Sequence, residues 1–198
     1  MKDLKLLYLL FVLPMVLLAC QKSDDYQLSQ SVFIEDPYYP GLPGYSEWGY
    51  NTFGAYIDRK PFTSNNYEIP AKIIVNGDVM HIIMKGDMLG QNVKLTFSIK
   101  GYSPPDYIDL KTLDNTVINL KDTGNTVTLE IGDSEKILNL IEGELTFKRV
   151  QNLYVDEELD RAIVSGTFNF KTFLDNEPVA ISHGRFDFGI GYENFYNY

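Results

Sequence analysis

The sequence predicts an all-β domain, an antiparallel meander that forms a sandwich or a barrel, preceded by a flexible lipidated tether. Three observations support this fold class. Apolar and polar residues alternate from Trp48 onward, turn motifs separate the alternating runs, and no segment has a sustained helical stripe. Successive side chains of a strand point to opposite faces of a sheet, so this alternation is typical of strands with one face in the core.

The clearest predicted strand is residues 93–100, in which every odd-numbered residue is apolar and every even-numbered residue is polar. Noisier runs of the same kind predict further strands at residues 52–57, 71–75, 79–85, 116–120, 126–131, 144–150, 162–173 and 179–188. We therefore expect about nine to eleven strands, with the usual uncertainty at their ends.

Turn signals separate these runs. Asn76-Gly77 lies between two apolar runs, which is the strongest short hairpin signal. The acidic run at residues 156–160 predicts a solvated hairpin turn, because it lacks the spacing of a calcium loop. Residues 86–90 and 103–106 indicate longer loops, and residues 136–141 could form one turn of helix.

The amino terminus has the features of an export signal. Residues 1–5 contain two lysines, and an apolar run follows at residues 6–19. This run is too short for a bilayer-spanning helix and has the length of a signal-peptide core. Residues 17–20, Leu-Leu-Ala-Cys, resemble the bacterial lipobox. The resemblance implies that residues 1–19 are removed and that Cys20 becomes the lipidated first residue of the mature protein.

The sequence predicts a tether over residues 20–47, followed by the β-domain over residues 48–198. The tether is rich in Ser, Gln, Asp, Pro and Gly, so it cannot bury enough apolar area to fold alone. Its aromatic residues indicate that its C-terminal end docks on the domain. Residues 22–25, Lys-Ser-Asp-Asp, look like the surface-export signal of Bacteroidetes-type lipoproteins. We therefore expect an outer-membrane location, lipid-anchored at the cell surface, with the periplasmic face as the alternative.

Three segments of the domain carry a wider family resemblance: residues 52–62, residues 165–170 (Ser-Gly-Thr-Phe-Asn-Phe) and residues 181–187. With the lipobox, they make the chain resemble small Bacteroidetes lipoproteins that have an all-β domain. The resemblance implies a fold and a compartment. It implies no activity, cofactor or catalytic residue.

Composition narrows the possible partners. Cys20 is the only cysteine, so an intramolecular disulfide is excluded. The formal net charge is −10, which repels nucleic acid and anionic headgroups. We therefore expect no nucleic-acid partner, and membrane attachment through the lipid anchor.

The sequence singles out no catalytic residue, metal ligand or cofactor. The two histidines, His81 and His183, lack partners at zinc-ligand spacing and fit ordinary strand positions. No Gly-x-Ser-x-Gly elbow and no phosphate loop occurs. A glycosidase needs a pair of carboxylates, and 27 acidic residues single out none.

Aromatic residues are the one compositional feature that suggests a ligand. Fourteen tyrosines are many for this length, and the candidates for stacking on a ligand are Tyr38, Tyr39, Tyr45 and Trp48. These rings could equally pack on the domain. Three functions stay open: a non-enzymatic binding or structural domain that contacts an envelope protein or glycan, a glycan-binding accessory protein of a polysaccharide-uptake system, and a glycoside-processing enzyme.

The lipobox gives the first testable prediction. Mass spectrometry of the mature protein is expected to show an acylated Cys20 and no residues 1–19. Cys20→Ala should release the protein from the membrane or leave it unprocessed. A free thiol at Cys20 or a retained Met1 would contradict the prediction.

Overall fold

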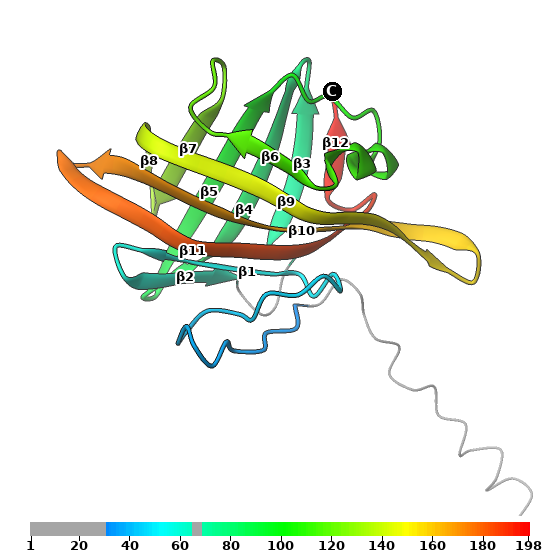
Figure 1. Cartoon of the computed structure of the whole chain (residues 1–198), viewed down its shortest axis with the longest axis horizontal. Coiled ribbons are helices and arrows are strands. Elements are labelled where there is room, and N and C mark those ends of the chain that lie inside the picture. The colour runs from blue at the N-terminus through cyan, green and yellow to red at the C-terminus, as the bar shows by residue number, and fades with distance from the viewer. Residues whose placement is uncertain (1–30, 65–68) are drawn as a thin grey trace, which may run out of the picture.

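The computed structural model describes residues 31–64 and 69–198. Cys20, the predicted signal peptide and the first part of the predicted tether lie outside these residues. The predicted all-β class is confirmed, because in the described residues twelve strands form one sheet whose pairs are antiparallel except for the parallel pair of β3 and β12. Of the two predicted arrangements, the structure has the sandwich, in which the sheet folds over on itself without closing (Figure 1).

The described residues contain slightly more strands than predicted, and a 3₁₀ helix, η1 (Tyr107–Leu113), lies between the fifth and sixth strands. In chain order the strands are β1 (Thr52–Ile57), β2 (Lys60–Ser64), β3 (Ala71–Asn76), β4 (Val79–Met88), β5 (Gln91–Lys100), β6 (Thr116–Asn119), β7 (Thr126–Ile131), β8 (Ser134–Ile137), β9 (Asn139–Val155), β10 (Glu158–Leu174), β11 (Glu177–Ile190) and β12 (Phe195–Asn197).

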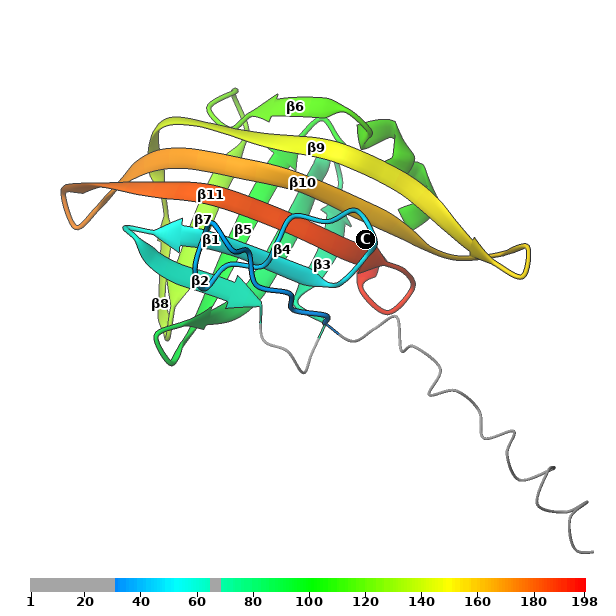
Figure 2. The same cartoon turned by 60° about the horizontal axis from the view of Figure 1, so that its bottom comes forward.

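The sheet order is β6-β9-β10-β11-β1-β2-β4-β5-β7-β8, with β3 beside β4 and β12 beside β3. The first six strands in this order, β6 to β2, form one layer. The remaining strands, β4, β5, β7 and β8 together with β3 and β12, cross behind them as the other layer (Figures 1 and 2). Within the described residues, two residue pairs, Thr63↔Asp87 and Ser64↔Gly86, connect β2 to β4. This short pairing is the corner at which the sheet turns from one layer into the other.

Aromatic rings fill the space between the layers. Phe97 of β5 packs edge to face against Phe168 and Phe170 of β10, with ring centroids 5.2 and 6.1 Å apart. Such tilted contacts add stabilisation beyond the area that the rings bury. The fully buried phenylalanines come from both layers and are Phe53, Phe62, Phe97, Phe147, Phe168, Phe170, Phe186 and Phe188.

Tight hairpins join most neighbouring strands. The predicted Asn76-Gly77 hairpin is confirmed between β3 and β4. Of the acidic run, Asp156 and Glu157 form the turn between β9 and β10, and the other three residues begin β10. In that turn Asp156 and Glu157 have φ values of 50° and 68°. Two successive positive φ values match the right-handed twist of the flanking strands, and Asp tolerates them better than most residues.

Two local predictions are wrong. Residues 136–141 form the end of β8 and the start of β9 rather than a turn of helix, because β8 pairs with β7 from Thr128↔Ile137 to Ile131↔Ser134. Residues 86–90 are not a long loop, since β4 runs to Met88 and only Leu89 and Gly90 make the turn.

Gly86 gives a prediction about the corner of the sheet. A Cβ atom at this position would lie 2.0 Å from the Thr63 carbonyl oxygen, so Gly86→Ala must part β2 from β4. We expect a loss of about 1–3 kcal/mol in the free energy of unfolding, measured by urea denaturation.

The matched control is Gly44→Ala, whose added Cβ would lie 3.6 Å from its nearest neighbour, the Ile34 carbonyl oxygen. We expect this change to stay within about 0.5 kcal/mol. Equal stability of the Gly86→Ala protein and the parent would show that the corner does not depend on this approach.

Candidate functional site

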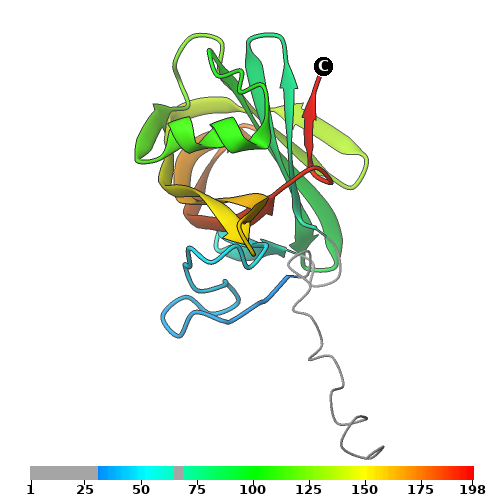
Figure 3. The same ribbon diagram turned by 90° about the vertical axis from the view of Figure 1, so that its right-hand side faces the viewer.

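The N-terminal segment, residues 31–51, lies along the outer face of β1 and β11 (Figure 3). It is held mainly by Asp187 of β11, whose side chain is only 2% exposed. Five donors satisfy the carboxylate, which offsets the cost of burying its charge. They are Gly49 N (2.8 Å) and Ser165 Oγ (2.7 Å) on Oδ1, and Ser46 Oγ, Trp48 N (3.1 Å) and Tyr50 N (3.1 Å) on Oδ2.

A second anchor fixes the earlier part of the segment. Arg185 Nη1 lies 2.5 Å from Asp36 Oδ2, and its guanidinium carbon lies 4.7 Å from the centre of the Tyr39 ring. The Tyr38 N–H donates to Asp36, and this bond, with the neighbouring Arg185, lowers the pKa of the Asp36 carboxyl. Leu42 is fully buried beside these contacts. The described part of the predicted tether is therefore packed on the sheet well before residue 47.

The four aromatic candidates take different positions on this segment. Tyr38 is 85% exposed, Trp48 is 71% exposed and Tyr45 is 37% exposed. The Tyr39 ring instead packs on the His183 ring, with centroids 4.4 Å apart. The structure therefore confirms docking for Tyr39, while Tyr38, Tyr45 and Trp48 keep surface that a ligand could contact.

Tyr45 stands between two shallow hollows. The first, of about 360 Å³, is lined by Tyr39, Tyr45, Lys148, Asn169 and Arg185, among others. The second, of about 540 Å³, is lined by Tyr45, Ser46, Glu47, Trp48, Arg149 and Gln151. We call this surface the Tyr45 face. Tyr38 lines neither hollow.

Contacts to both sides hold the Tyr45 ring. Its hydroxyl donates to Glu47 Oε1 at 2.8 Å, and the Lys148 Nζ lies 5.0 Å from the ring centre. Burial, together with the nearby Glu47 carboxylate, raises the pKa of the Tyr45 phenol. The hydroxyl therefore stays protonated at neutral pH and remains a donor.

A β-bulge in β9 places two cations on this face. Phe147 pairs with Gly166 and Arg149 pairs with Ser165, so Lys148 is an extra residue on its strand. Phe147 and Val150 are buried, whereas the two residues between them are both exposed. Bulges re-aim side chains in this way and are common beside functional sites. Sequence reasoning missed this pair, although two adjacent polar residues inside an alternating strand were a visible signal.

A second irregularity lies at His183 in β11. Phe168 pairs with Gly184 and Phe170 with Ile181, so the β11 strand has one residue more than β10 between these pairs. His183 takes a φ of 55°, which is uncommon for a residue other than glycine. The predicted strand positions of both histidines are confirmed, with His81 Nδ1 in β4 lying 2.9 Å from Ser98 Oγ.

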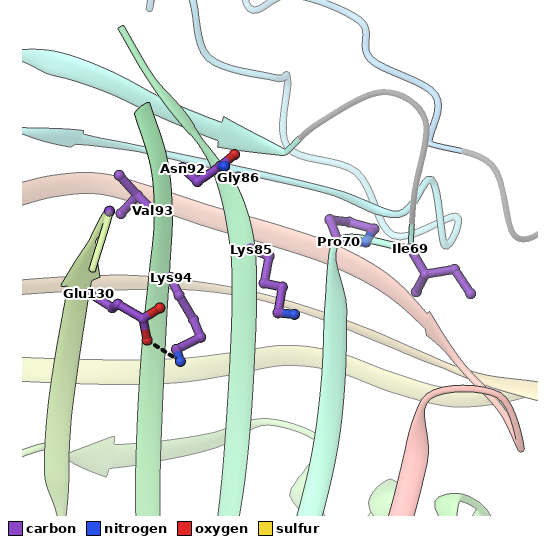
Figure 4. A pocket seen from close by; sticks show the side chains of 9 residues that line it. Ile69, Pro70, Lys85, Gly86, Asn92, Val93, Lys94 and Glu130 are labelled. Carbon is purple, nitrogen blue, oxygen red and sulfur yellow. Dashed lines mark ion pairs between the residues drawn. The ribbon is translucent and has the colours of Figure 1, made fainter. Parts of the chain in front are cut away.

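Other hollows have different chemistry. One, of about 330 Å³ on the other layer, is lined by Lys85 and by Lys94, which is ion-paired with Glu130 (Figure 4). No aromatic residue occurs among its described lining residues. A third surface, of about 480 Å³, includes Asp122, Glu142 and Glu144.

On the acidic surface, Glu142 does not have the character of a glycosidase acid. Lys171 Nζ lies 2.7 Å from Glu142 Oε1, and this hydrogen-bonded ion pair lowers the pKa of the Glu142 carboxyl. The acid of a glycosidase needs a raised pKa. In the described part of the chain, no three His, Cys, Asp or Glu side chains are grouped so as to hold a metal ion.

None of the described residues forms a helix long and apolar enough to span a membrane. In comparisons with known proteins, no family model, no curated protein and no solved structure matches the chain. The lipoprotein resemblance therefore stays a prediction from the sequence.

Asp187 gives the prediction for this site. Asp187→Asn replaces one acceptor oxygen by an NH₂ group that faces N–H and O–H donors. Because hydrogen bonds to a charged group contribute about 1.5–3 kcal/mol each, we expect a loss of about 3 kcal/mol or more in the free energy of unfolding. Trp48, the only tryptophan, should report release of the segment by a change in its fluorescence.

Asp133→Asn removes the same charge from an exposed turn and should change stability by less than about 0.5 kcal/mol. Similar losses in the two variants would mean that net charge, rather than the Asp187 hydrogen bonds, sets the stability.

Proposed function

We propose that this chain is a lipid-anchored envelope lipoprotein of the Bacteroidetes type, displayed at the outer membrane, whose β-domain binds carbohydrate on the Tyr45 face. The observation that carries the binding proposal is the position of Tyr45 and Trp48. Both rings keep exposed surface, and both line hollows that also contain polar side chains.

The chemistry of the Tyr45 face suits a sugar. Aromatic rings stack on the apolar C–H faces of sugar rings, and their polar tips stay solvated. Gln151 lines the Trp48 hollow and Asn169 lines the other, so each hollow has an amide that could bond to hydroxyl groups. The two hollows share Tyr45 as a common wall, which suits consecutive units of a polymer better than one compact ligand.

Preorganisation also supports binding. Trp48 donates its backbone N–H to the buried Asp187 carboxylate, and the Tyr45 ring is held by Glu47 and Lys148. Surfaces that are fixed before binding lose less conformational entropy when the ligand arrives. A flexible tether would lose more.

An enzymatic role has less support. Within their described linings, the two hollows of the Tyr45 face contain one carboxylate each, Asp36 and Glu47. Asp36 is ion-paired with Arg185, and Glu47 accepts the Tyr45 hydroxyl. Neither is arranged as an acid beside a free nucleophile.

Attachment and display rest on the sequence. The Leu-Leu-Ala-Cys run at residues 17–20 supports lipidation of Cys20, and residues 22–25 support export to the surface rather than retention on the periplasmic face. An anchored module with a ring-bearing face is the arrangement expected of a protein that captures polysaccharide at a cell surface.

The test is titration of the full chain with a panel of neutral and acidic polysaccharides, followed by Trp48 fluorescence and by calorimetry. We expect saturable binding to at least one of them. One stacked ring contributes about 1 kcal/mol, so Tyr45→Ala should weaken binding about fivefold. Trp48→Ala, measured by calorimetry, should do the same.

The matched control is Tyr154→Ala, which removes a tyrosine that is 60% exposed at the far end of β9. Its affinity should equal that of the parent. Absence of binding to every polysaccharide, or equal weakening by Tyr45→Ala and Tyr154→Ala, would overturn the proposal.

A further inference from the structure

We infer that the carbohydrate bound on the Tyr45 face is acidic, with its carboxylate or sulfate groups held by Lys148 and Arg149. This inference rests on the proposed function and deepens it by naming the ligand class. Both cations lie on the β9 bulge, Lys148 in the hollow with Tyr39 and Arg149 in the hollow with Trp48. Each ring of the pair Tyr45 and Trp48 therefore has a positive group beside it.

Neither of these two cations is held in an ion pair by the described residues of the protein. The chain has 27 acidic residues against 17 basic ones, yet within the described residues neither Lys148 nor Arg149 lies in an ion pair. On the same layer, by contrast, Lys171 is paired with Glu142 and Arg185 with Asp36. An anionic ligand would supply the missing partner.

Arg149 is held in a fixed orientation by a neutral group. Its Nε and Nη2 atoms donate to Gln151 Oε1 at 3.1 and 3.0 Å. The amide orients the guanidinium plane without cancelling its charge, and the remaining N–H groups stay available. A planar guanidinium with free donors matches the geometry of carboxylate and sulfate oxygens.

The bulge allows the two cations to lie on the same face of the sheet. In a regular strand, adjacent side chains point to opposite faces, so one of two neighbouring cations would point into the core. The extra residue in β9 lets Lys148 and Arg149 both face water, between the buried Phe147 and Val150. The local fold therefore concentrates positive charge at the rings, on a chain whose net charge is −10.

The carboxylates of the same face are already engaged. Glu47 Oε1 accepts the Tyr45 hydroxyl, and Asp36 is paired with Arg185 and also accepts the Tyr38 N–H. They reduce the positive potential of the hollows, so we expect moderate affinity that depends on salt.

The experiment compares polygalacturonate, its carboxyl-reduced neutral form and dextran sulfate on the full chain. We expect polygalacturonate or dextran sulfate to bind at least about tenfold more tightly than the neutral form, with affinity falling as salt is raised. Binding of the first identifies a carboxylate ligand, and binding of dextran sulfate alone identifies a sulfate ligand.

The test variant is Lys148→Gln/Arg149→Gln, which keeps hydrogen-bonding side chains and removes both charges. It should lose about tenfold in affinity for the acidic polymer and less than about twofold for any neutral glycan that binds the rings. Unfolding midpoints of this variant and the parent are compared first, and Lys148→Arg/Arg149→Lys, which keeps both charges, should retain most of the affinity.

The matched control is Lys72→Gln/Lys85→Gln, which removes two cations from the opposite layer. It should bind like the parent. Equal affinity of the parent for acidic and neutral forms, or a loss in the Lys72/Lys85 variant that matches the Lys148/Arg149 variant, overturns the inference. Neutral binding that weakens about fivefold in Tyr45→Ala while acidic preference is absent leaves the proposed function standing and rejects the acidic ligand.

Discussion

The buried carboxylate of Asp187 is the interaction on which the arrangement of the Tyr45 face depends. It joins three parts of the chain, because Asp187 itself lies in β11 while its donors come from residues 46–50 and from Ser165 of β10. A carboxylate with this little exposure is tolerated only when its oxygens are satisfied. Each donor therefore stabilises the position of the others, and the backbone at Trp48 has little freedom to move.

The two irregular strands complement this fixed segment. β9 gains a residue at Lys148, and β11 carries His183 at a positive φ beside the Tyr39 ring. In regular strands, side chains would alternate evenly between the two faces along the segment. The bulges instead supply one position for a pair of cations and another for a ring that the segment packs on. The same face thus combines held aromatic groups with two cations that form no ion pair within the described residues.

Most of the sheet could be predicted from the sequence because period-two alternation is a local property. It identified β5 from residue 93 to residue 100, missing the first two residues of the strand, and most of the other strands approximately. It failed at β8, where all four residues are exposed and no face is selected for the core. It also missed β2, which begins with Lys60 and Pro61, and β12, which has only three residues.

The site was harder to predict because its contacts are long-range. By alternation Asp187 occupies an outward position between Phe186 and Phe188, and it is buried only because the N-terminal segment covers it. No local pattern predicts that Asp187 accepts a hydrogen bond from Gly49, which lies 138 residues away in the sequence. The candidate rings were recognised as a group from their clustering, but which of them would be covered depended on Arg185 and His183, whose roles appear only in the folded chain.

Docking of the N-terminal segment also determines how the domain would respond to mechanical force. A pull applied at residue 31 would first load the bond from the Val32 N–H to the Tyr50 carbonyl oxygen, and then the ion pair between Asp36 and Arg185. The four bonds that Ser46, Trp48, Gly49 and Tyr50 donate to Asp187 come later along the chain, before any strand of the sheet is reached. The segment would therefore detach from the sheet in steps, and the chain would lengthen under force while the sandwich stays folded.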